Sequence, residues 1–158
     1  MIMSEERMIR QYDAIIAHQG RERVMVVKLV SYDHWRLPYG DHFETEFPIE
    51  TARRILGDAA GLHDEDIRYA QATGDVERIG FSREDKETWD MSATANLYLE
   101  RDLRFYVADL AEKVSTIRKG HRIDAVNMVR PERLNEFLVG DELRIVEDIC
   151  LDIVAGRL

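Results

Sequence analysis

Apolar residues recur along the first part of the chain with two spacings, one typical of helices and one typical of strands. Over residues 4–19 they recur at steps of three and four, Ser4 can cap a helix there, and Gly20 can end it. Residues 24–30 form a short run rich in valine, which is typical of a strand buried on both faces. This pattern predicts a first helix followed by a central strand.

The next segment predicts a loop, a strand and a helix. Residues 33–41 contain a proline and a glycine, which indicate a loop. Residues 42–47 alternate between charged residues and phenylalanine or threonine, as expected of a half-buried strand. Pro48 can open a helix with one apolar face, and Gly61 can end it.

The middle of the chain predicts a hairpin, a linker and a long helix. Residues 67–81 contain the turn sequence Thr-Gly-Asp at 73–75, so they predict two strands joined by a turn. The polar segment 82–92 predicts an exposed linker. Apolar residues then recur at helical spacing over 97–117, and we expect a long helix there.

The C-terminal part predicts two more helices. Pro131 can start the first, which would run to Val139, whereas residues 123–129 are too short and mixed to assign. Residues 142–155 fit both a helix and a strand. A helix is the better fit, because the polar residues there fall together on a helical wheel: Glu147, Asp148 and Asp152.

Together these elements predict an α+β fold. An antiparallel sheet of about four strands in the N-terminal half would be covered by helices, and the C-terminal half would be helical. We expect one domain over residues 1–158, consisting of a mixed part (1–81), a linker (82–92) and a helical part (93–158).

Composition narrows the classes of partner. The chain has 22 Lys and Arg residues against 31 Asp and Glu residues, a net charge of −9, so broad binding to nucleic acid or to an anionic membrane is disfavoured. Cys150 is the only cysteine, which excludes an internal disulfide and favours a reducing compartment. With no signal-like N-terminus and no long apolar run, we expect a cytoplasmic protein.

The densest set of polar side chains lies in and after the predicted loop. His42, Glu44 and Glu46 would point the same way on a strand and could converge on a divalent ion, with His34 nearby in the loop. The alternative is the solvated face of a half-buried strand. No recognised metal-binding spacing is present.

One segment opposes the overall charge. Residues 118–133 hold five Lys and Arg residues against two acidic residues. A phosphate, a nucleotide or an acidic partner could bind there, although cations near a helix end also need no ligand. The candidate residues for an anion or partner site are Arg118, Lys119, His121, Arg122, Arg130 and Arg133.

The sequence contains none of the local signatures of common enzyme classes. Residues 97–117 and 143–154 carry apolar residues on more than one face, which suggests a homodimer or another protein partner. The sequence therefore favours a small non-enzymatic binding or regulatory protein without a cofactor. One alternative is a small metal-dependent enzyme or metal-binding protein using His34, His42, Glu44 and Glu46. The other is nucleotide or nucleic-acid binding at the basic segment 118–133. Cys150 is expected to be a core residue rather than a nucleophile.

Overall fold

The computed structural model describes residues 7–30, 34–80, 98–114, 117–120 and 122–157. In chain order, the elements are β1 (Arg7–Gln19), β2 (Arg23–Leu29), β3 (Trp35–Arg36), β4 (Tyr39–Asp41), α1 (Pro48–Ala60), the short 3-10 helix η1 (Asp64–Asp66), β5 (Ile67–Gly80), β6 (Tyr98–Leu110), β7 (Ile123–Val129), the 3-10 helix η3 (Pro131–Glu136) and α3 (Gly140–Val154).

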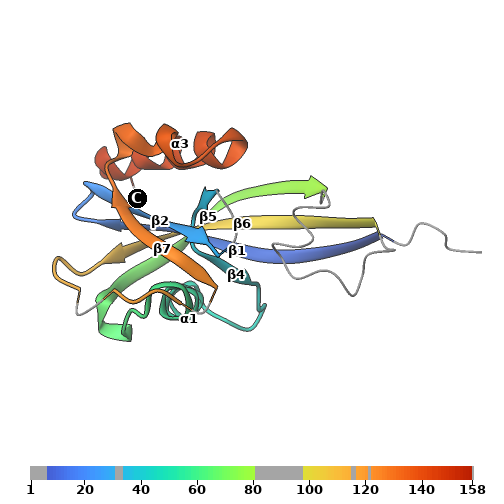
Figure 1. Cartoon of the computed structure of the whole chain (residues 1–158), viewed down its shortest axis with the longest axis horizontal. Coiled ribbons are helices and arrows are strands. Elements are labelled where there is room, and N and C mark those ends of the chain that lie inside the picture. Colours follow the sequence, from blue (N-terminus) through green and yellow to red (C-terminus); the bar gives the residue numbers. More distant parts are fainter. Residues whose placement is uncertain (1–6, 31–33, 81–97, 115–116, 121, 158) are drawn as a thin grey trace, which may run out of the picture.

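The strands form one mixed sheet between two helices. Seven strands take part, in the order β3-β2-β1-β6-β5, with β4 paired to β1 and β7 paired to β2. β1 and β6 run parallel over their whole length, and the other pairs are antiparallel. Figure 1 shows α3 on one side of this sheet and α1 on the other. Among the described residues, no helix is long and apolar enough to cross a membrane.

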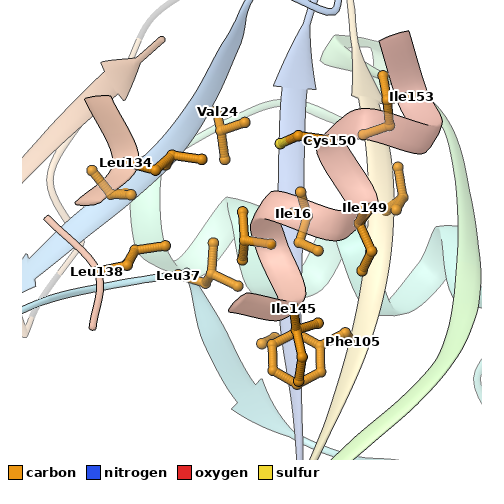
Figure 2. Packing of buried hydrophobic residues seen from close by; sticks show 14 of the residues in the cluster. Ile16, Val24, Leu37, Phe105, Leu134, Leu138, Ile145, Ile149, Cys150 and Ile153 are labelled. Atoms are coloured by element: carbon orange, nitrogen blue, oxygen red, sulfur yellow. The ribbon is translucent and has the colours of Figure 1, made fainter. Parts of the chain in front are cut away.

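Each face of the sheet has its own core. Alternate residues of β1 point to opposite faces, so Tyr12, Ala14 and Ile16 join the cluster under α3, and Ile15 and Ala17 join the cluster over α1. Figure 2 shows the α3 side, where the helix packs its apolar residues onto β1 and β6. The labelled residues are Ile16, Val24, Leu37, Phe105, Leu134, Leu138, Ile145, Ile149, Cys150 and Ile153.

The predicted fold class is wrong. The sheet has seven strands and is mixed, instead of about four antiparallel strands, and β6 and β7 lie in the half that was expected to be helical. Two predicted helices, over 4–19 and 97–117, are the central strands β1 and β6. Residues 12–18 are all buried because both faces of β1 are covered. A strand buried on both faces has no polar alternation, so its apolar residues can also match a helical spacing.

Four further predictions differ from the structure. The predicted loop 33–41 contains the short strands β3 and β4. Residues 42–47 form a loop instead of a strand. The predicted hairpin over 67–81 is the single strand β5, in which the pairing with β6 is interrupted between Ala72 and Val76, so the predicted turn is a bulge. The segment from Pro131 forms a 3-10 helix of six residues. The predicted linker 82–92 lies outside the described residues.

Three elements are confirmed. The strand expected over 24–30 is β2, and the helix expected from Pro48 is α1, which ends at Gly61 in a left-handed conformation with φ of 67°. The last segment is the helix α3. Residues 97–117 carry apolar residues on more than one face because β6 contributes side chains to both hydrophobic cores. Self-association stays a prediction.

Candidate functional site

The most unusual polar group in the structure is the buried carboxylate of Asp13, in the middle of β1. His42 Nδ1 lies 2.9 Å from both carboxylate oxygens of Asp13. The strand pairing produces this contact, because β4 pairs antiparallel with β1 and places Asp41 beside Tyr12. The backbone N–H of His42 then donates to the carbonyl of Gln11 at 3.0 Å, which holds the imidazole over the sheet.

A salt bridge lies beside the Asp13–His42 contact. Arg54 of α1 donates to both carboxylate oxygens of Glu46, from Nε at 2.9 Å and from Nη2 at 2.8 Å. The Thr51 hydroxyl donates to Glu46 at 2.9 Å, and Arg54 also donates to the carbonyl of Asp41 at 2.7 Å. These bonds tie the loop 42–47 to the first half of α1. The Arg54 guanidinium lies over the Phe43 ring, 4.5 Å from its centre.

A second guanidinium group reaches the same region from β6. Arg104 is directly opposite Asp13 in the parallel register of β1 and β6. Its Nε is buried and has no hydrogen-bond partner within the described part of the chain. Tyr106, two residues further on, faces the core next to α1. We call Asp13, His42, Glu46, Arg54 and Arg104 the Asp13 cluster.

The surroundings shift the pKa values of these groups in opposite directions. Burial raises the pKa of Asp13, while the hydrogen bond to His42 and the charges of Arg54 and Arg104 partly offset that rise. The hydrogen bond from Arg54 lowers the pKa of Glu46. Burial raises the pKa of Tyr106, and the nearby Asp13 raises it further. The electrostatics of the cluster therefore distinguish two carboxylates, one buried and one held by a guanidinium.

The Asp13–His42 pair has the geometry of an oriented base. An ionised carboxylate only accepts hydrogen bonds, so Nδ1 of His42 is the donor in this contact. The side chain of His42 is 10% exposed and that of Asp13 is fully buried. A buried carboxylate that fixes the tautomer of a partly exposed imidazole prepares it to take a proton from a water or a hydroxyl group.

The residues predicted to hold a metal are not brought together as a metal site. His42 bonds to Asp13, and Glu46 bonds to Arg54 and Thr51. Glu44 is exposed in a turn, and His34 is exposed before β3. The sequence prediction assumed a strand over 42–47, and a loop does not keep alternate side chains on one face.

The described residues do not fit a divalent cation elsewhere either. No group of three or more His, Cys, Asp or Glu side chains in the described ranges is placed to hold a metal ion. The buried face of α1 consists of Thr51, Ala52, Ile55, Leu56, Ala59 and Ala60. Of the acidic residues on α1, Glu50 accepts from the backbone N–H of Phe47, and Asp58 is exposed. Hard cations need several oxygen ligands, and this donor set does not provide them.

The candidate residues of the basic segment 118–133 do not form one site. The backbone N–H groups of Arg118 and Gly120 donate to the carbonyls of Ala60 and Ala59, at 2.7 and 3.0 Å, so this stretch covers the C-terminal end of α1. Lys119 is exposed there. The carbonyl of Arg122 accepts from Val30. His121 lies outside the described residues. Of the six candidates, Arg130 and Arg133 line a common cavity, together with Arg23.

Sequence reasoning missed most of the Asp13 cluster. The sequence predicted a helix over residues 4–19, which contain Asp13, and it assigned no role to Asp13, Arg54 or Arg104. One signal was available for Asp13, since it is the only charged residue between Gln11 and Ala17 in a stretch of otherwise apolar character. A charge in such a run indicates a buried, partnered group. Cys150 is buried as predicted, and burial raises its pKa to about 11.

Comparisons with known proteins identify the fold. No family model matches the chain, and no curated protein matches it. Solved structures do match. An Ap4A hydrolase from C. elegans is 14% identical, with a TM-score of 0.64, and the match covers 93% of this chain and 98% of that one. The E. coli dihydroneopterin triphosphate pyrophosphohydrolase is 9% identical, with a TM-score of 0.69 over 90% of this chain and 95% of the other.

A third structure names the family of folds. It is described as a Nudix hydrolase from Listeria monocytogenes, is 15% identical, has a TM-score of 0.62, and the match covers 94% of both chains. The chain has a Nudix-hydrolase-like fold. This likeness contradicts the prediction of a non-enzymatic binding or regulatory protein. That prediction rested on the lack of local enzyme signatures, and the proteins that share this fold are named as hydrolases.

Proposed function

We propose that the chain is a hydrolase that acts on a phosphorylated small molecule at the Asp13 cluster. The observation that carries the proposal is the fully buried Asp13 carboxylate holding the imidazole of His42 at 2.9 Å. It lies in a fold that this chain shares with an Ap4A hydrolase and a triphosphate pyrophosphohydrolase. Both of those names denote cleavage of phosphate anhydrides, which gives the substrate class.

We assign the proton transfer from the attacking water to His42. With Nδ1 bonded to Asp13, Nε2 accepts a proton from the attacking water. The carboxylate of Asp13 then stabilises the imidazolium that forms. A positioned base of this kind contributes about 10²- to 10⁴-fold to a rate.

The arginines of the cluster match the charge of a phosphate. Hydrolysis of a phosphate anhydride depends mainly on positioning and on neutralising oxygen charges. Arg104 brings a buried Nε without a partner in the described residues, directly opposite Asp13 in the sheet. Arg54 is occupied by Glu46, so its role is to hold the loop and to add positive potential.

Two aromatic rings lie on the loop beside the cluster. Phe43 is 48% exposed and Phe47 is 72% exposed, which is unusual for side chains of this size. Flat apolar rings next to a cationic site suit a substrate with an aromatic ring, such as a nucleobase, because both components can stack. Divalent cations assist many phosphoryl transfers, but the described donor set does not fit one, and no step is assigned to a metal.

The test is hydrolysis by the purified full chain. Diadenosine tetraphosphate, dihydroneopterin triphosphate and nucleoside triphosphates are each incubated with the protein, with and without Mg²⁺, and products are separated by ion-exchange chromatography. We expect turnover of at least one compound, with a loss of about 10²-fold or more in His42→Gln. His63→Gln, in an exposed loop, is the matched control and should keep full activity.

The outcome that overturns the proposal is clear. Hydrolysis by the wild type that is no faster than by His42→Gln, for every compound, removes His42 from the chemistry. Circular dichroism and thermal unfolding of His42→Gln show whether the variant is folded. If it is not, Arg104→Lys serves instead, because it keeps the charge but loses the planar donor set.

A further inference from the structure

A cavity of about 330 Å³ lies at the C-terminal end of β7, away from the Asp13 cluster. Its walls include three arginines, Arg23, Arg130 and Arg133, with Asn127 and the ring of Phe137. Among the described residues, no carboxylate lines it. In a chain with a net charge of −9, a cavity lined by three arginine residues is a local exception.

The local fold brings these residues together from three segments. A tight turn after β1 starts β2 at Arg23. β2 pairs antiparallel with β7, so that Val24 is opposite Val129, and the residues flanking them, Arg23 and Arg130, lie at the same end of the pair. Pro131 then starts η3, and Arg133 in this 3-10 helix and Phe137 directly after it also line the cavity.

The cavity is distinct from the Asp13 cluster. Gln19 pairs with Arg23 at the end of β1. From Asp13 to Gln19 a strand advances by about 20 Å, at roughly 3.3 Å per residue. A small molecule that fills the cavity therefore does not reach His42.

The side chains of the cavity are suited to an anion. Arg23 makes a long contact of 3.5 Å to the Met128 carbonyl. Arg133 pairs with Glu136 on the surface, at 2.8 and 3.0 Å, which fixes its guanidinium and takes up part of its charge. Guanidinium groups around one cavity repel one another, and an anion between them removes that cost. Their planar donors match phosphate oxygens two at a time.

One wall of the cavity is aromatic and rigid. The Phe137 ring meets Trp35 edge to face, with centres 5.2 Å apart, and both pack against the core under α3. A fixed ring beside arginines suits a ligand that joins a phosphate to a flat ring. A volume of about 330 Å³ is at the lower end for small-molecule sites and too small for a folded partner.

We infer that this cavity binds a phosphorylated small molecule with an aromatic ring, of the size of a nucleoside monophosphate, separately from the Asp13 cluster. The inference does not depend on the proposed hydrolysis. It also narrows the anion site expected over 118–133 to Arg130 and Arg133, and adds Arg23 from a distant part of the chain.

The test is calorimetric titration of the full chain with three probes: inorganic phosphate, AMP and adenosine. We expect AMP to bind more tightly than phosphate and adenosine to bind weakest. The double variant Arg130→Gln/Arg133→Gln should bind AMP about tenfold to a hundredfold more weakly, because charged hydrogen bonds are lost. Arg157→Gln removes a similar exposed pair, with Asp152 at 2.7 Å, and should leave AMP binding unchanged.

Three results would overturn the inference. They are no AMP binding at millimolar concentration, equal affinity in the double variant and the wild type, and equal affinity for phosphate and AMP, which would exclude the ring. AMP binding that disappears in His42→Gln instead would move the ligand to the Asp13 cluster. These binding measurements test the cavity even if the hydrolysis assay shows no activity, because they do not depend on turnover.

Discussion

Asp13 and His42 are 29 residues apart in the chain, yet Nδ1 of His42 lies 2.9 Å from both carboxylate oxygens of Asp13. Asp13 lies in the middle of β1 with no exposed surface, and His42 lies in the loop after β4. Burial of a carboxylate without a partner is costly. The pairing of β4 with β1 supplies that partner, and the contact defines the part of the molecule to which we assign function.

Replacing Asp13 with asparagine is expected to change how stability depends on pH. Burial raises the pKa of Asp13 above its usual 3.8, so the folded chain takes up this proton more readily than the unfolded chain. The contribution of Asp13 to stability is therefore present below pH 3.8 and is lost as the pH rises through the raised value. An asparagine side chain does not titrate, so Asp13→Asn should gain stability relative to the wild type over that range.

Urea unfolding of both proteins at a series of pH values measures this difference. Asp75→Asn, at an exposed position in β5, is the control for loss of one acidic charge. A difference between Asp13→Asn and the wild type that stays constant across the pH range would contradict the prediction.

Glu46 should contribute to stability in the opposite pH range. The hydrogen bond from Arg54 lowers the pKa of Glu46 below 4.5, so its contribution is present above pH 4.5 and is lost as the pH falls through the lowered value. At neutral pH, Glu46→Gln should reduce the free energy of unfolding by about 1 to 3 kcal/mol, as expected for hydrogen bonds to a charged group. The loss should shrink in acid.

Glu136→Gln is the matched control, because Arg133 holds Glu136 with the same two-point geometry. The side chain of Glu136 is 53% exposed, against 18% for Glu46, so its replacement should change stability less. If urea unfolding shows that both variants lose the same free energy of unfolding, burial does not determine how much the Glu46–Arg54 pair contributes to stability.

Two glycine-to-alanine changes near the end of α1 should act in opposite directions. A Cβ at Gly120 would overlap the backbone carbonyl of Asp58, and backbone cannot move aside easily. A Cβ at Gly57, inside α1, would make only an ordinary contact of 3.6 Å with the carbonyl of Leu62. Gly120→Ala should therefore lower the thermal midpoint, and Gly57→Ala should raise stability by roughly 0.5 to 1 kcal/mol through helix propensity.

Differential scanning calorimetry of both variants checks the pair. A Gly120→Ala protein as stable as the wild type would mean that the segment 117–120 does not pack against α1 as described.

The thiol of Cys150 should be almost unreactive in the folded chain. It lies on the buried face of α3, and burial raises its pKa to about 11, so very little thiolate forms at neutral pH. A colorimetric disulfide reagent at pH 8 should label the native protein slowly and the urea-unfolded protein at once. Fast labelling of the native protein would contradict the placement of Cys150 in the core.

The sequence pattern predicted an element correctly where neighbouring residues determine its conformation. Pro48, Gly61 and the apolar spacing between them predicted α1, and the valine-rich run predicted β2. The grouping of Glu147, Asp148 and Asp152 on one side identified α3 as a helix. In each case residues within a few positions of one another set the conformation and the buried side.

The central strands and the site depended on contacts between distant segments. β1 and β6 pair in parallel across about 90 positions, with Arg7 opposite Tyr98 at one end and Gln19 opposite Leu110 at the other. Their helix-like apolar spacing did not reveal that each would be covered on both faces. The same pairing places Arg104 beside Asp13, and the β1–β4 pairing adds His42. By itself, the sequence determined the outer helices and one strand, because those follow from neighbouring residues. Only the tertiary structure decided the mixed sheet, the Asp13 cluster and the arginine cavity, because backbone pairing between remote strands brings those side chains together.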